Sequence, residues 1–201
     1  MSEFVNTVDI IGDDALCDRI ITRTLTEYSD SHVKTIGDYA MQGCTSLTTI
    51  NFPNVTIVDM FAFYGCSALK TANLPIAEEL RGYCFYKNSK LESINIPLVV
   101  DVGKQTFGEC AALSKIQLAS TKSIGELAFM SCTGLTALIL HSTTVCKLEN
   151  VNAFQDSSIS AGTGYIYVPS ALVNEYKSAT NWSVFADRIR AIESYPGVVG
   201  G

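Results

Sequence analysis

The chain has 201 residues and a formal net charge of −6, with 47% hydrophobic and 17% charged residues. This composition supplies enough apolar side chains for a packed core and argues against disorder over most of the length. No cluster of Lys or Arg suits nucleic acid, and no apolar run reaches the roughly 18 residues that a transmembrane helix needs.

Residues 1–32 precede a repetitive region and are expected to form an N-terminal cap. Within them, a short helix is predicted to begin at Asp13–Asp14 and to end near Arg19. The N-terminus lacks both a basic n-region and an uninterrupted apolar h-region, so no signal peptide is predicted. If full length, the chain is expected to be virion-associated or cytoplasmic; if a fragment, it could belong to the cell surface.

Residues 33–145 contain five 22-residue repeats that align without gaps from Ile36 onward. Each repeat opens with an aliphatic residue, then has a small residue followed by a large apolar one, and then a Leu. The opening residues are Ile36, Val58, Leu80, Val102 and Ile124, the large ones Met41, Phe63, Phe85, Phe107 and Phe129, and the leucines Leu47, Leu69, Leu91, Leu113 and Leu135.

Each leucine begins a segment L-x-x-[IAL]-x-[LFI], whose alternation predicts one short strand with one buried face. One such strand cannot bury its apolar side alone. Stacked repeats bury a continuous core, and so the pattern predicts a right-handed α/β solenoid with a parallel β-ladder. At a strand spacing of ~4.8 Å, five coils give a stack of roughly 24 Å.

The consensus I-G-x-x-A-F-x-x-C-x-x-L-x-x-I-x-L-P resembles the BspA-type leucine-rich repeats of bacterial, phage and some protozoan proteins. The resemblance covers residues 33 to about 141, and residues 165–193 are similar to the C-terminal cap of such arrays. It implies a leucine-rich-repeat fold and a role in surface adhesion or ligand binding rather than catalysis. Members of the family include cell-surface adhesins and proteins encoded in phage structural regions.

Residues 146–193 are expected to form a degenerate repeat and a helical C-terminal cap. Tyr165 to Val168 should form a last strand, Pro169 should begin a helix that runs to about Lys177, and a second short helix should start at Asn181 or Ser183. The second helix should carry Trp182, Phe185 and Ile189. Residues 194–201 are expected to be a flexible tail.

Four cysteines share one column of the repeat, and Asn88 takes the same place in the middle repeat. No C-x-x-C pair suggests a metal site, so a row of buried, reduced thiols is expected, with Asn fitting equally well. A disulfide between stacked neighbours is the alternative. The two histidines, His32 and His141, are isolated, and so no catalytic residue, cofactor or metal site is predicted. The column cysteines are Cys44, Cys66, Cys110 and Cys132.

Two outward surfaces are candidates for partner binding. The first is a file of amides on successive strands, which either bond to one another along the stack or recognise a polar ligand such as a glycan or a peptide. The second is an aromatic surface, which suits protein and sugar interfaces but could equally pack between coils or against the first cap. The amides are Asn51, Asn73, Asn95 and Gln117, and the aromatic residues are Tyr39, Phe61, Tyr83, Tyr64 and Tyr86.

These features predict a non-catalytic recognition or adhesion module that presents a rigid surface to a protein or glycan, on a phage virion or a bacterial surface. The alternative hypothesis is a structural scaffold or decoration subunit that contacts identical or neighbouring chains in an assembly. Replacing the outward aromatic residues should abolish partner binding in the first case and alter the oligomeric state in the second.

Overall fold

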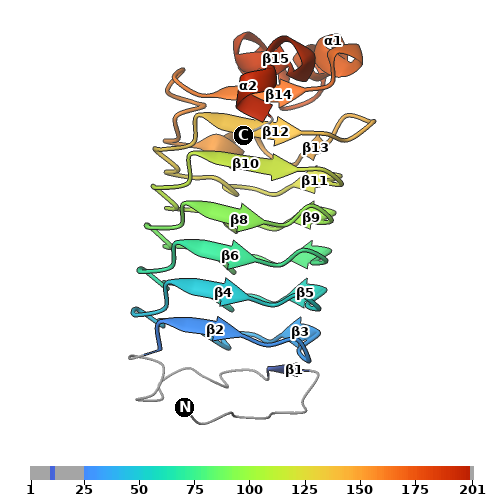
Figure 1. The fold of residues 1–201 in the computed structure, drawn as a ribbon. Coiled ribbons are helices and arrows are strands. Elements are labelled where there is room, and N and C mark those ends of the chain that lie inside the picture. The colour runs from blue at the N-terminus through green and yellow to red at the C-terminus, as the bar shows by residue number, and fades with distance from the viewer. Residues whose placement is uncertain (1–9, 12–24, 200–201) are drawn as a thin grey trace.

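The computed structural model describes residues 10–11 and 25–199, which form a solenoid of stacked coils (Figure 1). The front strands run from left to right while the chain climbs from the N-terminal to the C-terminal end, so the coil is right-handed, as predicted. The coils bury the apolar columns of the repeat in their interior, where Ile36, Leu47 and Phe63 are all fully buried.

The front strands confirm the predicted ladder. Residues 22 positions apart pair in parallel, for example Thr49 with Thr71 and Thr71 with Ser93. In the described part of the chain these strands form two four-stranded sheets, β2-β4-β6-β8 and β10-β12-β14-β15, so the pairing stops between β8 and β10. Their bounds are β2 Glu27–Ser29, β4 Thr49–Asn51, β6 Thr71–Asn73, β8 Ser93–Asn95, β10 Lys115–Leu118, β12 Ala137–Leu140, β14 Tyr165–Val168 and β15 Ile189–Ala191.

A second ladder runs along the coils, where only one strand per repeat was expected. Among the described residues it is a seven-stranded parallel sheet, built where each repeat opens. Each of its strands has two residues, too few for an alternating pattern to be recognised in the sequence. They are β1 Ile10–Ile11, β3 Thr35–Ile36, β5 Ile57–Val58, β7 Glu79–Leu80, β9 Asp101–Val102, β11 Ser123–Ile124 and β13 Lys147–Leu148.

One column of the core is a continuous stack of phenylalanine rings. Adjacent ring centroids lie 5.1, 5.8, 5.4 and 5.6 Å apart, and adjacent rings are tilted by at most 14°. Every ring in the stack is fully buried. Aromatic stacking adds to the hydrophobic gain of burial, and so this column ties five coils together. The rings belong to Phe63, Phe85, Phe107, Phe129 and Phe154.

The two ladders begin earlier in the chain than the predicted first repeat. Strand β2 pairs with β4 one repeat further on, and β1 pairs with β3. The described residues of the expected N-terminal cap therefore extend both ladders. The helix expected from Asp13–Asp14 to Arg19 lies outside the described residues.

The C-terminal end is closed by short helices, close to the prediction. Trp182 stands at the centre, fully buried, with its indole Nε1 donating to the Cys146 carbonyl at 2.6 Å. The Cys146 amide in turn donates to the Tyr176 hydroxyl at 2.8 Å. Ile189, expected on the second helix, instead begins β15 and extends the front sheet. The helices are η2 Val151–Phe154, η3 Ser170–Leu172, α1 Val173–Ser178 and η4 Ser183–Arg188.

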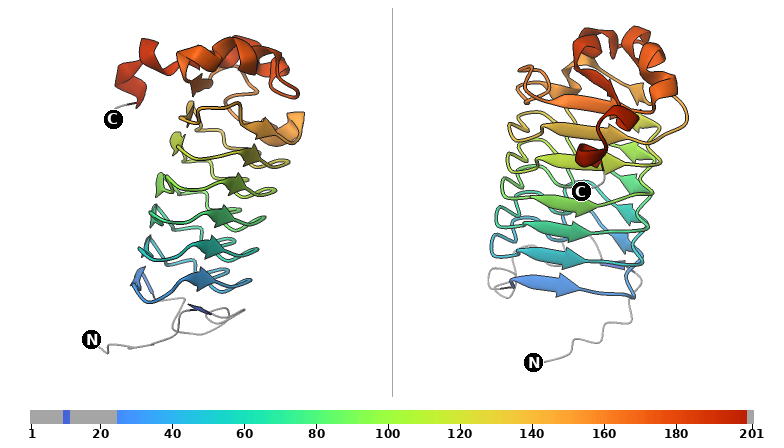
Figure 2. Two further views of the ribbon diagram at one scale, coloured as in Figure 1. Left: turned by 90° about the vertical axis from the view of Figure 1, so that its right-hand side faces the viewer. Right: turned by 45° about the horizontal axis from the view of Figure 1, so that its top comes forward.

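The last described residues include part of the segment that was expected to be a flexible tail. They form η5 (Ile192–Ser194) and α2 (Pro196–Val199), and α2 lies in front of β12 and β14 (Figures 1 and 2). Ile192 and Val198 pack over Ala137, Ile139 and Tyr167. These three outward side chains are therefore buried, although the alternation of the strands directs them away from the core.

Several turn residues have left-handed backbone angles. Gly43 and Gly65 have φ of 68° and 69°, and Lys87 occupies the next place in that column with φ of 63°. A left-handed backbone costs a residue with a Cβ ~1–2 kcal/mol. A Gly avoids this cost but loses more chain entropy on folding, which costs ~0.5–1 kcal/mol. Lys87→Gly should therefore raise the free energy of unfolding by roughly 0.5–1 kcal/mol in urea denaturation, whereas Lys87→Ala should not. Equal stability of the two variants would contradict this account of the turn.

Candidate partner-binding surfaces

The five predicted aromatic residues come together in one contiguous cluster, called here the aromatic cluster. Phe61 is at its centre, with its ring centroid 4.8 Å from those of both Tyr39 and Tyr83 and nearly parallel to them. Tyr64 and Tyr86 form a second file, 5.5 Å apart, and each lies 5.8 Å from a ring of the first. Three coils thus contribute to a single surface.

Backbone geometry places the first file of the aromatic cluster at the surface. Tyr39, Phe61 and Tyr83 all have left-handed φ, between 57° and 63°, in the turn that follows the second ladder. Tyr39 is 36% exposed and the other rings are partly buried. Because neighbouring rings stack on one another, the faces of the central ring are already covered. The cluster therefore offers ring edges and hydroxyl groups, which suit a protein partner better than stacking of a sugar.

Tyr86 is fixed in place from two sides. Its hydroxyl donates to Glu109 Oε1 at 2.5 Å, and a Cβ at Gly108 would lie only 2.6 Å from its ring. Burial of the phenol, together with the nearby Glu109 carboxylate, raises the pKa of Tyr86 to about 12. The phenol consequently stays protonated at neutral pH and keeps its hydrogen bond.

The predicted amides do form a ladder along the stack. Asn95 Nδ2 donates to Asn73 Oδ1 at 2.7 Å, Asn73 Nδ2 donates to Asn51 Oδ1 at 2.7 Å, and Asn51 Nδ2 donates to Ser29 Oγ at 3.0 Å. Gln117 lies one coil further on, with Oε1 3.3 Å from His141 Nε2. Hydrogen bonding between neighbouring side chains, the structural alternative for this file, therefore uses part of the hydrogen-bonding capacity of these amides.

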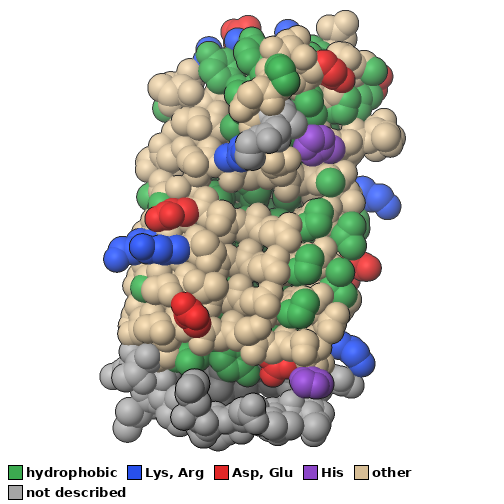
Figure 3. Space-filling model, viewed as in Figure 1, with side chains coloured by type: hydrophobic (Ala, Val, Ile, Leu, Met, Phe, Trp, Pro, Cys, Tyr) green, Lys and Arg blue, Asp and Glu red, His purple; other side chains and the backbone are tan. Residues whose placement is uncertain are grey.

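The amide ladder lies in a shallow hollow of the front face. A parallel file of hydroxyls stands two positions away, where Thr71 Oγ1 donates to Thr49 Oγ1 at 3.1 Å. Figure 3 shows this face hollowed over β4, β6 and β8, lined mainly by uncharged atoms, with hydrophobic side chains along one edge. In the turns that follow β6 and β8, Ile76 and Leu98 are 36% and 43% exposed.

The cysteine column is a row of buried thiols, and the six cysteines of the described residues are free. Burial raises the pKa of the Cys132 thiol to about 12, so it stays protonated at neutral pH. Three of the thiols donate to a backbone carbonyl of the preceding coil, as from Cys66 to Met41 at 3.1 Å. Asn88 does not fit equally well: it is fully buried, and neither of its amide atoms has a hydrogen-bond partner among the described residues.

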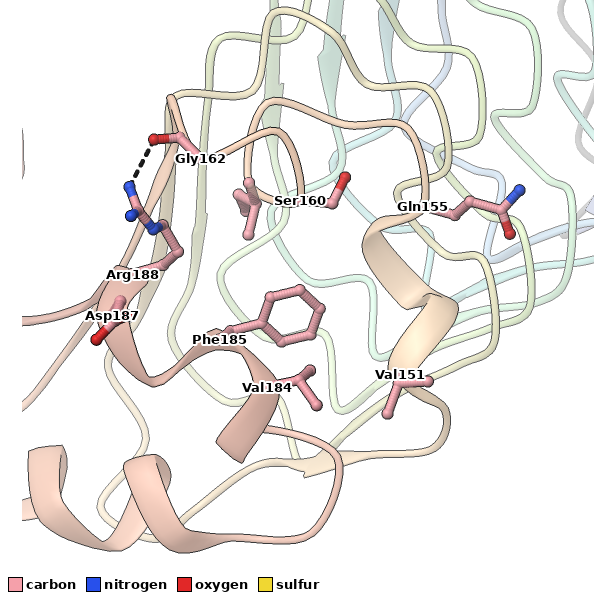
Figure 4. A pocket seen from close by; sticks show the side chains of 9 residues that line it. Val151, Gln155, Ser160, Gly162, Val184, Phe185, Asp187 and Arg188 are labelled. Carbon is pink, nitrogen blue, oxygen red and sulfur yellow. Dashed lines mark hydrogen bonds between the residues drawn. The ribbon is translucent and has the colours of Figure 1, made fainter.

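A pocket of about 480 Å³ in the C-terminal cap was not predicted from the sequence (Figure 4). It is rimmed by Val151 and Val184, which are 46% and 65% exposed. Arg188 donates to the Gly162 carbonyl, and Ser160 Oγ donates to the backbone of Ser157. Arg188 and Ser160 are thus engaged with the backbone, while Gln155 and Asp187 also line the pocket.

The repeats match the family profile described as the BspA type leucine-rich repeat region, in six copies over residues 9–136 and 101–170. The chain belongs to this family, which confirms the resemblance seen in the consensus. Leucine-rich-repeat proteins of this kind are protein-interaction modules and are generally not catalytic. No helix in the described part of the chain is long and apolar enough to cross a membrane, and those residues contain no group of three potential metal ligands.

Solved structures share the fold at low sequence identity. A leucine-rich repeat protein from Bacteroides ovatus is 22% identical with a TM-score of 0.70, over 90% of this chain and 45% of that one. A leucine-rich cell surface protein from Faecalibacterium prausnitzii is 24% identical with a TM-score of 0.53, over 68% and 44%. The pneumococcal vaccine antigen PcpA is 16% identical with a TM-score of 0.65, over 83% and 40%. The chain thus spans less than half of each of these structures, and no curated protein matches it significantly.

Proposed function

We propose that the chain is a non-catalytic recognition module that binds a protein partner through the aromatic cluster. The observation that carries this proposal is the convergence of five aromatic side chains from three coils on one partly exposed surface. Tyrosine edges and hydroxyls give large contact area at low entropic cost, as protein interfaces favour. The cell-surface description of the Faecalibacterium relative is consistent with a role on a bacterial surface.

Tyr39 and Tyr83, the outer rings of the first file, allow a test that preserves the fold. Asn tolerates left-handed φ better than most residues, and so Tyr39→Asn/Tyr83→Asn removes both outer rings without new backbone strain. Interface aromatic residues often contribute 2 kcal/mol or more, and the double variant should therefore bind at least about tenfold more weakly. The measurement is saturation binding of labelled protein to intact bacterial and epithelial cells.

Gln105→Asn is the matched control, because Gln105 occupies the same left-handed position two coils from Phe61 without an aromatic ring. It should bind like the parent chain. Unchanged binding of the double variant would overturn the assignment of the cluster. A failure of the parent chain to bind any cell would favour the scaffold alternative, in which the double variant changes the sedimentation behaviour of an assembly instead.

A further inference from the structure

A groove runs along the front face, on a different stretch of each coil from the aromatic cluster. One hollow of about 440 Å³ is floored by β4, β6 and β8. A second, of about 410 Å³, is lined by β8, β10 and His141. The two hollows share Ser93, Ile94 and Asn95, so they form one channel, called here the ladder groove. The ladder groove crosses the point where strand pairing stops between β8 and β10.

The first hollow of the ladder groove is uncharged but rich in hydrogen-bonding groups, whereas Glu92, Lys115 and His141 are among the residues that line the second. The first hollow is lined by Thr, Ser and Asn together with Ile50, Ala72 and Ile94, and by no ionisable side chain. An amide group has two N–H donors and two acceptor lone pairs. Within the ladder, the internal rungs Asn51 and Asn73 each use one N–H donor and one acceptor lone pair. Each rung therefore keeps one donor and one acceptor, side by side, which matches a hydroxyl group that both donates and accepts.

The spacing of the rungs fits a linear sugar chain better than an extended peptide. Parallel strands place successive rungs ~4.8 Å apart, whereas an extended peptide advances ~3.3 Å per residue, and ~6.6 Å between side chains of one face. A peptide laid along the stack would thus lose register within two coils, while the rings of a linear glycan repeat at close to one rung.

We infer that the ladder groove binds a linear, neutral glycan along the stack, with sugar hydroxyls bonded to the amide rungs and the neighbouring hydroxyl file. The site is independent of the aromatic cluster and does not require the proposed protein partner. The groove offers the four amide rungs Asn51, Asn73, Asn95 and Gln117, and Ser29 continues the file at one end. Its affinity should consequently rise with chain length and level off at about four to five sugars.

The test is calorimetric titration of the purified chain with cello-, manno- and xylo-oligosaccharides, from disaccharide to hexasaccharide. Asn73→Ala removes the central rung, and Thr71→Val removes a hydroxyl at an exposed position while keeping the shape of the side chain. Each should weaken binding of the longest ligand by about tenfold. Tyr39→Asn/Tyr83→Asn is the matched control and should bind the oligosaccharide like the parent chain.

Three results would overturn the inference. The first is no binding by any of the three neutral series. The second is binding that Thr71→Val and Asn73→Ala leave unchanged. The third is tighter binding of an anionic oligogalacturonate of equal length, because the first hollow has no ionisable side chain and Lys115 in the second is matched there by Glu92. Circular dichroism of both groove variants checks that a loss of binding does not reflect unfolding.

Discussion

Phe85→Ala should lower the free energy of unfolding by about 3–5 kcal/mol, since it removes a fully buried ring and leaves a cavity. Phe85 lies in the middle of the stack, 5.1 Å from Phe63 and 5.8 Å from Phe107. Each repeat contacts only its neighbours, and so a break in the middle column also weakens the coupling between the two halves of the solenoid. Because whole domains are stable by only ~5–15 kcal/mol, this loss is large.

The measurement for Phe85→Ala is urea denaturation followed by tryptophan fluorescence, which reports on the buried Trp182 in the cap. Phe61→Ala serves as the comparison, because Phe61 is also stacked on both sides but is only partly buried. Phe61→Ala should lower the free energy of unfolding clearly less than Phe85→Ala does. An equal loss for the two variants would mean that stacking, and not burial, determines the contribution of these rings.

Asn88→Cys should raise the free energy of unfolding by about 1–3 kcal/mol. The amide of Asn88 is fully buried without a hydrogen-bond partner among the described residues, which carries a desolvation cost of that size. A thiol suits the position, because one coil further on Cys110 Sγ donates to the Phe85 carbonyl at 3.2 Å. The substitution would place a fifth cysteine in the column and remove the uncompensated amide.

The midpoint of urea denaturation under reducing conditions measures this gain, with the slope expected to stay constant. Asn88→Ser is a useful second variant, since a hydroxyl is also small and can donate to the equivalent carbonyl of the preceding coil, which the 25-residue register of the column places at Phe63. A loss of stability in both variants would show that the amide of Asn88 has a partner that the account lacks, such as an internal water.

The repeat explains why so much of the fold could be predicted. Every column of the 22-residue pattern keeps its size and polarity, and stacking is the arrangement that lets one strand per coil bury its apolar face. The same register predicts that the five residues of the aromatic cluster lie near one another. It also predicted the amide ladder, which the contacts among Asn51, Asn73 and Asn95 confirm.

Other features depend on contacts that no repeat pattern encodes. Ala137 and Ile139 are outward residues of a strand, and only the packing of Ile192 and Val198 shows that they are covered. The two-residue strands such as β5 are held by pairing between coils and carry no signal of their own. Asn88 occupies a cysteine position in the sequence, and its cost appears only once its buried amide is seen to lack a hydrogen-bond partner among the described residues. Local sequence specifies the coil, whereas the ends and the exceptions depend on tertiary packing.

The central claim, that the aromatic cluster is the partner-binding surface, is tested most directly by hydroxyl-radical footprinting of the parent chain, free and bound to cells. Tyr39 and Tyr83, the outer rings of the cluster, should lose most of their labelling on binding, whereas Tyr195, 40% exposed on the C-terminal segment, should not. Bound protein in which Tyr39 and Tyr83 are labelled as strongly as in the free chain would contradict the account and move the binding surface elsewhere.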